Sequence, residues 1–116
     1  MNRKFRIARE SDFKRVRGSG KTTAHPLVVL VVADGIAENS RAGIITSKSL
    51  GTAVERNRTR RRLRAILSTL LPRTTRRVDV LLIARKPILK ANFYELRKAV
   101  IQLFVREKCL EKNELT

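Results

Sequence analysis

The stretch of this sequence best suited to chemistry is "ERNRTRRRLR", residues 55–64, in which six of the ten side chains are arginine. A guanidinium is always charged, and its planar fork can donate two parallel hydrogen bonds to one phosphate. Glu55 is the only acid in the run. Like charges four residues apart on a helix, such as Arg56 and Arg60, repel each other unless an anion is bound. The pattern therefore favours a phosphate-binding helix over a solvated basic face.

The charge of the whole chain points the same way. Its 116 residues include 27 lysines and arginines against 10 acids, for a net charge of +17, so internal pairing cannot neutralise the arginine run. A domain with this charge attracts polyanions, of which nucleic acid is the commonest and an acidic membrane the second. No apolar run is long enough to span a bilayer, and the basic N-terminus lacks the apolar core of a signal peptide. A single cysteine, Cys109, suits a reducing cytoplasm.

The sequence offers little for catalysis by the polypeptide itself. General acid–base chemistry or a metal site would need clustered histidine, aspartate or glutamate. Asp12, Asp34 and Asp79 are scattered along the chain, and His25, the only histidine, comes just before a proline at the start of an expected strand. We therefore expect no catalytic residue, no metal ligand and no cofactor bound by the protein, and we interpret His25 as structural.

The elements that would position the arginine run can be read from the apolar patterns. With 116 residues and 42% hydrophobic composition, the chain should form one domain, residues 1–116, with an ordered core over about 5–108, a short basic N-terminus and a polar C-terminal tail. Ser11 is a candidate N-cap for a short first helix, "DFKRVR", that ends at Gly18 and Gly20. The runs "HPLVVLVVA" (25–33) and "RAGIITS" (41–47) are predicted to pair as an antiparallel hairpin, with "KTTAH" (21–25) as a short edge strand. "VDVLLIA" (78–84) reads as a strand covered on both faces.

Two further helices complete the expected fold. In the middle helix an apolar stripe runs over Leu63, Ile66, Leu67, Leu70 and Leu71, and Pro72 ends it. The stripe is missing before Leu63, so the arginine half should project past the sheet, with Arg56 and Arg60 on the azimuth of the stripe. The last helix, about 92–109, has Asn92 as N-cap, carries Cys109 as an inert side chain, and shows the following core positions: Phe93, Leu96, Val100, Leu103 and Phe104. The predicted class is α+β, an α/β sandwich with three helices on a mixed sheet of about four strands in the order α-β-β-β-α-β-α.

At these residues the chain resembles a known family. "SKSLGTAVERNRTRRRLR", residues 47–64, is similar to the signature of the bacterial ribonuclease P protein subunit, whose Arg-Asn-Arg core would be Arg56, Asn57 and Arg58. "LLIARKP" (81–87) resembles the strand after the signature helix, and "SDFKRV" resembles the first helix. The resemblance spans roughly residues 3–108 and implies a left-handed β-α-β crossover through the signature helix, which periodicity could not suggest.

The resemblance implies a function and partners. The holoenzyme, a cytoplasmic bacterial ribonucleoprotein, removes the 5′ leader from precursor tRNA. Its RNA subunit performs the hydrolysis with Mg²⁺, so the protein alone would be inactive. The expected partners are the catalytic RNA and precursor tRNA, with no membrane and no obligate protein partner. The residues expected to bind the catalytic RNA are Lys48, Arg56, Asn57, Arg58, Arg60, Arg61, Arg62 and Arg64.

The resemblance also implies a groove for the leader between the first helix and the sheet. Phe13 matches one aromatic of that groove, while Arg17 and Val31 stand where the family has two others. An arginine can stack on a base or pair with phosphate, but a valine can only pack, so leader binding here should depend more on charge and on salt. Phe13 could also simply anchor the helix, and Lys48 could be a solvated loop charge.

Two other functions remain open from the residues alone. A non-catalytic RNA-binding protein, such as a ribosomal protein or RNA chaperone, would fit the same size, charge and fold class, and only the signature block argues against it. A membrane-surface or DNA-compacting protein fits less well, because the leucine stripe is needed for the core and no dimeric groove-reading motif appears.

Overall fold

The computed structural model describes residues 1–115, and over that range the chain forms three α-helices and one four-stranded sheet. The elements are α1 (Glu10–Ser19), β1 (Lys21–Ala24), β2 (Val28–Asp34), β3 (Arg41–Ile45), α2 (Ala53–Leu70), β4 (Val78–Ala84) and α3 (Phe93–Arg106). Two short 3₁₀ turns precede the longer helices: η2 (Lys48–Leu50) comes before α2, and η4 (Lys86–Lys90) comes before α3. The predicted fold class and element order are confirmed.

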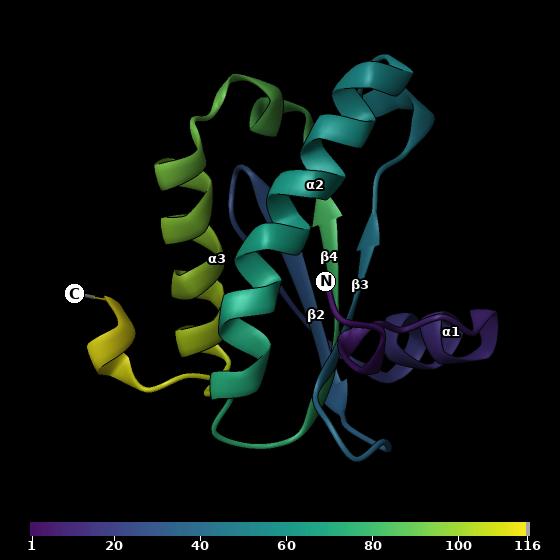
Figure 1. Cartoon of the computed structure of the whole chain (residues 1–116), viewed down its shortest axis with the longest axis vertical. Coiled ribbons are helices and arrows are strands. Elements are labelled where there is room, and N and C mark those ends of the chain that lie inside the picture. Colours follow the sequence, from purple (N-terminus) through teal and green to yellow (C-terminus); the bar gives the residue numbers. More distant parts are fainter. Residues whose placement is uncertain (116) are drawn as a thin grey trace.

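The sheet lies between two unequal helical layers (Figure 1). Helices α2 and α3 cover one face, where Leu30, Leu82 and Phe104 belong to the larger core. Helix α1 covers part of the other face, over a small cluster that includes Val16, Val31 and Leu81. Alternate residues of β2 and β4 therefore point into different cores, which explains why both strands are apolar almost throughout.

The strand order β1-β2-β4-β3 shows that the predicted hairpin between the second and third runs is wrong. Strand β4 lies between β2 and β3, antiparallel to the first and parallel to the second, so that Leu82 faces both Leu30 and Ile44. The reason is burial: β4 is the most completely buried of the strands, with only Ile83 partly exposed, and the central position covers both its faces and both its edges. The edge strand β1 was predicted correctly.

The crossover from β3 through α2 to β4 is left-handed. In Figure 1 both arrows point upward, α2 passes in front of the sheet, and β4 lies to the left of β3. The family resemblance implied this hand, although crossovers between parallel strands of one sheet are nearly always right-handed.

The helices bury the faces expected of them, with one exception. Leu63, Ile66, Leu67 and Leu70 of α2 are buried, as are Leu96, Val100, Leu103 and Phe104 of α3. Phe93, predicted to be in the core, is 44% exposed. It is the first residue of α3, one turn before Leu96, where the helix meets solvent rather than the sheet.

The helix ends differ in how they are capped. Thr52 with Glu55 forms a capping box on α2, and Asn92 with Glu95 forms one on α3, as the Asn92 prediction required. The prediction for α1 was wrong: the helix begins at Glu10, Ser11 lies inside it, and no side chain caps it. Ion pairs join this helix to the sheet, between Arg15 and Asp79 and between Asp12 and Arg41.

The C-terminal cysteine lies just past the last helix. The free thiol of Cys109 is three residues beyond α3 rather than on it, and burial raises its pKa to about 11. Within residues 1–115, no helix has the length and hydropathy to cross a bilayer.

Candidate nucleic-acid interface

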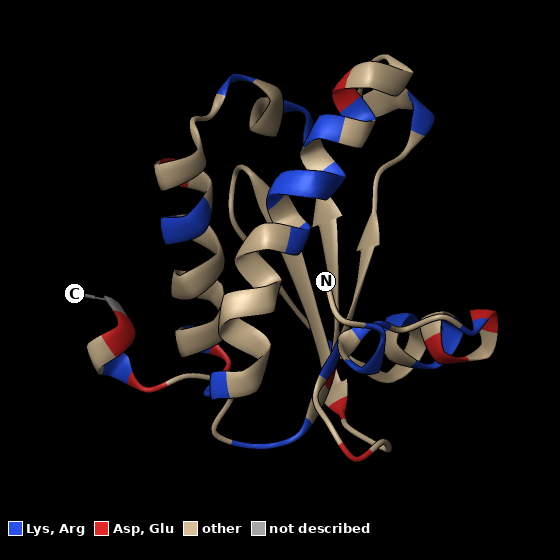
Figure 2. Cartoon of the chain, in the orientation of Figure 1, with Lys and Arg blue, Asp and Glu red and all other residues tan. Residues whose placement is uncertain are grey.

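The basic half of α2 extends beyond the ends of the strands. Figure 1 shows the first turns of α2 standing above the tips of β3 and β4, and Figure 2 shows that lysine and arginine gather in this part of the helix. Glu55, the only acid nearby in sequence, is used for the helix cap: its Oε1 accepts a hydrogen bond from the Thr52 amide at 2.9 Å. Because Glu55 is used in the helix cap, it does not pair with the arginines that follow it.

The arginines of α2 point in three directions, and the first is toward β3. Arg60 donates from Nε to Thr46 Oγ1 at 3.0 Å and from Nη1 to Asn57 Oδ1 at 2.8 Å, which fixes both side chains. Arg56 is half-buried one turn earlier, and its Nε, fully covered, has no hydrogen-bond partner in the structure. A covered guanidinium nitrogen without an acceptor costs free energy, and this nitrogen would reach an acceptor outside the chain only if the side chain moved.

The second direction is toward η4 and α3. Arg62 Nη2 donates to the carbonyl of Ala91 at 2.8 Å, and Arg58 lies one turn before it beside Leu89. Desolvation, together with the charge of Arg58, lowers the pKa of Arg62 from its usual value. The two cations therefore repel each other in a partly covered site, which an anion would relieve.

The third direction is outward to solvent. Arg61 and Arg64 are exposed and line a shallow hollow with Val54 and Asn57. Lys48, in η2, is exposed just before the helix. The structure thus places at one end of the molecule all eight residues expected to bind the catalytic RNA: Lys48, Arg56, Asn57, Arg58, Arg60, Arg61, Arg62 and Arg64.

The carboxylates of the chain do not neutralise this cluster. Among residues 1–115, none of the six arginines between positions 55 and 64 forms an ion pair. The acids are used elsewhere, above all on the opposite face of the sheet. The end of the molecule around α2 therefore carries uncompensated positive charge.

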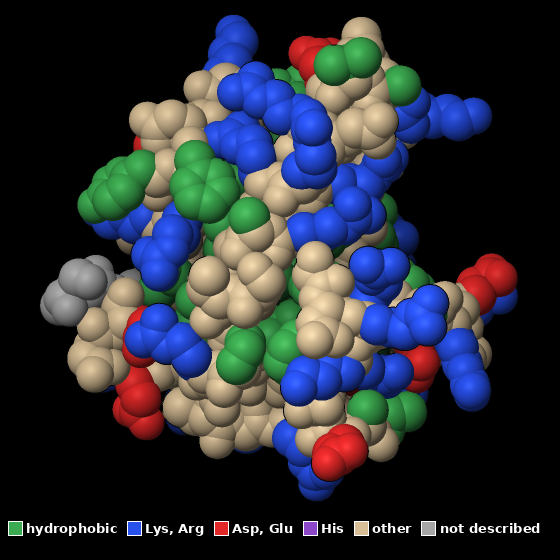
Figure 3. Space-filling view, in the orientation of Figure 1, with side chains coloured by type: hydrophobic (Ala, Val, Ile, Leu, Met, Phe, Trp, Pro, Cys, Tyr) green, Lys and Arg blue, Asp and Glu red, His purple; other side chains and the backbone are tan. Residues whose placement is uncertain are grey.

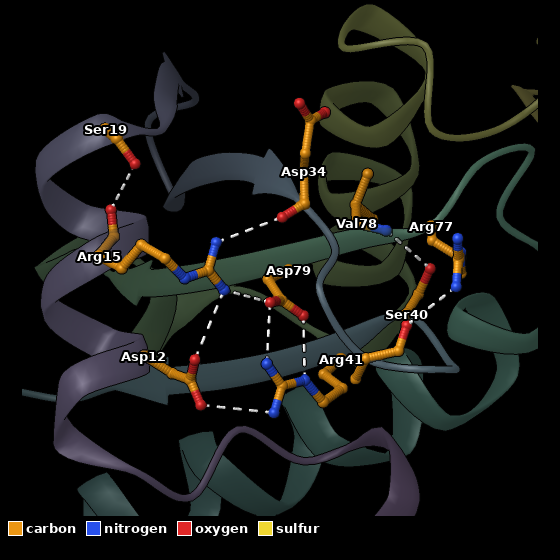
Figure 4. Close-up of polar contacts among 10 residues, drawn as sticks. Asp12, Arg15, Ser19, Asp34, Ser40, Arg41, Arg77, Val78 and Asp79 are labelled. Carbon is orange, nitrogen blue, oxygen red and sulfur yellow. Dashed lines mark hydrogen bonds and ion pairs between the residues drawn. The ribbon is translucent and has the colours of Figure 1, made fainter.

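That opposite face holds a network of ion pairs under α1 (Figure 4). Asp79 of β4 is fully buried and accepts hydrogen bonds from Arg41 Nε and Nη2 at 3.1 and 2.9 Å, and a further one from Arg15 of α1. Arg41 also pairs with Asp12 of α1 at 3.4 Å. Asp12 and Asp79, which looked scattered in the sequence, are thus brought together and held by arginines. The signal in the sequence was the lone aspartate inside "VDVLLIA", which could not be buried without a cation.

Next to this network, α1 and the sheet place the three residues expected in a leader groove. Phe13 lies against β3 at Gly43, where an added Cβ would be 2.6 Å from the Phe13 ring, so the glycine makes room for the aromatic. Arg17 is exposed on α1. Val31 is only 2% exposed and packs beneath α1, so it can shape the floor of a groove but presents no surface to RNA. Ile45 and Ile83 continue this face beyond Phe13 and are half-buried.

His25 has a local structural role. Its Nδ1 accepts a hydrogen bond from the Leu27 amide at 3.0 Å, which requires that nitrogen to be unprotonated. Partial burial, followed by the charge of Arg106, lowers the pKa of His25 from its usual value. The described residues 1–115 contain no group of three or more histidine, cysteine, aspartate or glutamate side chains that could hold a metal ion.

One feature near the arginines escaped the sequence analysis. Phe93 and Tyr94 are the first two residues of α3, and both are exposed. Helical spacing predicted Phe93 to be in the core and made no prediction for Tyr94. The available signal was Asn92: a cap at that position starts the helix at Phe93, and the buried stripe only begins one turn later.

Comparisons with known proteins agree with this geometry. A family model described as Ribonuclease P matches residues 1–108. The ribonuclease P protein component of Chloroflexus aggregans is 40% identical over 111 residues, covering 95% of this chain and 82% of the relative. That of Herpetosiphon aurantiacus is 41% identical over 114 residues, covering 98% and 93%. Among solved structures, the RNase P protein of Staphylococcus aureus superposes with a TM-score of 0.82 at 25% identity, covering 92% of this chain and 98% of that one.

Proposed function

The chain belongs to the ribonuclease P protein family, the protein subunit of an endoribonuclease that processes tRNA 5′ ends, and on this premise we propose that it binds ribonuclease P RNA through α2 and the 5′ leader of precursor tRNA beside α1. The family membership also decides against the ribosomal-protein and chaperone alternatives. The observation that carries the proposal is the set of six arginines on α2 that no carboxylate among residues 1–115 neutralises.

The arrangement of these arginines favours a phosphate backbone over a single anion. Arg60 points toward β3, Arg62 toward α3, and Arg61 to solvent, so the charges surround the helix instead of converging on one point. A folded RNA presents phosphates on several sides of a groove, and each contact releases condensed counterions. Helix α2 is therefore proposed to lie along the backbone of the RNA, with Asn57 and Lys48 adding polar contacts.

The leader is proposed to follow the face of the sheet beside α1. Phe13 offers an aromatic ring for a base, Arg17 offers a guanidinium for a base or phosphate, and Val31 supports the floor from below. Half-buried Ile45 and Ile83 give this face an apolar strip on which unpaired nucleotides can lie. Because Arg17 replaces an aromatic, binding of the leader should weaken more steeply with salt than binding to an all-aromatic groove would.

The hydrolysis itself is proposed to belong to the RNA subunit. Asp12 and Asp79 are held by arginines, and the Nδ1 of His25 is engaged by a backbone amide, so the described residues offer no free acid–base pair. They also offer no cluster of metal ligands, and the Mg²⁺ of the holoenzyme is therefore assigned to the RNA. When bound there, Mg²⁺ supplies an activated water and stabilises the charge on the phosphate. The protein contributes positive charge that lets two polyanions approach.

Reconstitution tests this proposal. Ribonuclease P RNA from the same organism is assayed with precursor tRNA at a low Mg²⁺ concentration that leaves the RNA alone inactive. Adding the protein should restore removal of the leader, whereas an unrelated basic protein of similar charge should not. Failure to restore cleavage, or cleavage by the protein without RNA, would overturn the proposal.

A further inference from the structure

Two neighbouring aromatic side chains are exposed on α3 without any role in the core. The chain has only four phenylalanines and one tyrosine, and no tryptophan. Phe104 is fully buried, yet Phe93 is 44% and Tyr94 72% exposed. Aromatic side chains gain the most from burial, so leaving two consecutive ones of the five in water indicates that something else covers them.

The surroundings of this pair are basic and belong to the same surface as α2. The guanidinium of Arg62 is bonded to the carbonyl of Ala91, two residues before Phe93. Lys90 is exposed in η4, and Lys98 is exposed one helical turn after Tyr94. Figure 3 shows the apolar side chains at the start of α3 standing beside lysine and arginine side chains of α2 and η4.

An aromatic surface surrounded by cations fits an RNA base better than it fits a protein. Rings of this kind stack on the π-face of unpaired bases while nearby cations hold the phosphates. A second copy of this chain would bring two strongly positive surfaces together, since each carries a net charge of +17, and would be repelled. Charge complementarity therefore selects a polyanion with exposed bases.

From these observations we propose that Phe93 and Tyr94 form a stacking platform for an unpaired base of ribonuclease P RNA, next to the backbone held by α2. The inference rests on the proposed function, because it assigns the RNA bound along α2 as the source of the base. It adds a second kind of contact, in which stacking at α3 supplements the charge on α2. The precursor tRNA is the other possible source of such a base, and the experiment separates the two.

The intrinsic fluorescence of the protein gives a direct test, because Tyr94 is its only tyrosine and no tryptophan is present. Ribonuclease P RNA is titrated into the protein, and the emission is corrected for absorption by the RNA. Stacking should quench Tyr94 in step with binding. The matched control is the double variant Tyr94→Phe, Ile36→Tyr, in which the single tyrosine is at another position. Residue 36 lies in the exposed loop after β2, at the opposite end of the strands from the start of α3. The tyrosine emission of this variant should not change when the RNA binds.

Affinity measurements add a second test. Tyr94→Leu keeps a good helix former at an exposed position but removes the ring. It should raise the Kd for ribonuclease P RNA by about 5- to 10-fold, near the low end for one stacked base, and Tyr94→Trp should restore it. Because stacking releases no counterions, the slope of log Kd against log salt should not change. Arg58→Ala should instead reduce that slope by about one.

Each outcome decides the matter. If the RNA binds through the arginines of α2 but Tyr94 emission is unchanged and Tyr94→Leu binds like the wild type, the platform is wrong and the proposed function stands. Quenching that appears only when precursor tRNA is added to the holoenzyme would overturn the assignment to ribonuclease P RNA. A change in self-association with no change in RNA affinity would point to a protein contact and also overturn it. If the wild-type protein fails to bind ribonuclease P RNA at all, the proposed function falls first, and this inference falls with it.

Discussion

Arg41 and Asp79 face each other across the parallel strands β3 and β4, and two hydrogen bonds at 3.1 and 2.9 Å join the guanidinium to the carboxylate. Arg15 of α1 bonds to the same carboxylate, and Asp12 of α1 pairs with Arg41. The pair between the strands is thereby extended to the helix above them. Since Phe13 follows Asp12 directly, this network also determines where the aromatic of the proposed leader groove lies.

Replacing Asp79 by asparagine should therefore destabilise the protein. The variant keeps the shape of the side chain but leaves Arg41 and Arg15, both partly buried, with Asp12 as their remaining counter-charge. Removing one partner of a buried ion pair costs about 3–5 kcal/mol, and because Arg15 is partly exposed we expect about 3 kcal/mol. Urea unfolding followed by circular dichroism measures the change in the free energy of unfolding.

Asp34→Asn is the matched control for Asp79→Asn. Its carboxylate is almost fully exposed and meets Arg76 only at 3.5 Å. A surface pair of this kind contributes about 0–1 kcal/mol, so this variant should unfold much like the wild type. Equal losses in the two variants would show that the buried network does not hold α1 in place.

The arginines of α2 should show the opposite behaviour, with a loss of binding but not of stability. Arg58→Ala with Arg61→Ala removes two charges that make no ion pair, so the free energy of unfolding should change by less than about 0.5 kcal/mol for each. Affinity for ribonuclease P RNA should fall, and the salt slope of log Kd should decrease by about two. Filter binding over a series of salt concentrations measures both.

The double variant Arg76→Ala, Arg77→Ala is the control for net charge. Both side chains are exposed near the opposite end of β4. It removes the same charge from the chain but none from α2. If it weakens RNA binding as much as the α2 variant does, the total charge of the protein, rather than this helix, determines affinity.

Much of the fold could be predicted from local patterns, and what could not be predicted is non-local. Apolar runs located β2, β3 and β4, the polar stretch KTTAH was correctly predicted as the edge strand β1, and the stripe from Leu63 located the core face of α2. The position of β4 between β2 and β3 was not predicted, because the sequence of a strand that is buried on both faces does not indicate which strands pair with it. The hand of the crossover came only from the family resemblance, since general statistics favour the other hand.

The candidate site was likewise predictable where it depends on local sequence and not where it depends on residues far apart in the chain. The arginines of α2 were predicted from a physical conflict visible in the sequence, namely like charges on a helix with no acid to pair with. The network around Asp79 was missed because Asp12, Arg41 and Asp79 are far apart in the chain. The exposed position of Phe93 was missed because helical periodicity gives the face of a residue but not whether a neighbouring element covers it.

Phe13 can be tested for a role in leader binding separately from its packing. Phe13→Leu keeps an apolar side chain against Gly43 but removes the ring. The Kd of the holoenzyme for precursor tRNA should rise about fivefold or more, as expected for the loss of one stacked base, while the Kd for mature tRNA should not change. Equal effects on both RNAs would mean that Phe13 only anchors α1.

Arg17→Ala should lower the salt dependence of binding to precursor tRNA, which carries the leader, and should not change the salt dependence of binding to mature tRNA.

His25 should act as a neutral structural residue whose protonation destabilises the fold. Its pKa in the folded state is lowered below 6.5, so the native protein binds this proton less well than the unfolded chain does. The stability that His25 provides is therefore present above pH 6.5 and is lost as the pH falls through the folded-state pKa. His25→Asn is the matched variant, because an asparagine oxygen can accept the same hydrogen bond from the Leu27 amide without titrating. Between pH 7.5 and 5 the wild type should lose more unfolding free energy than His25→Asn.

NMR of the single histidine ring gives its pKa directly, and a value above 6.5 would contradict the structural role. The pH dependence of leader removal by the reconstituted holoenzyme should be the same for both proteins, since no step of the reaction is assigned to this ring.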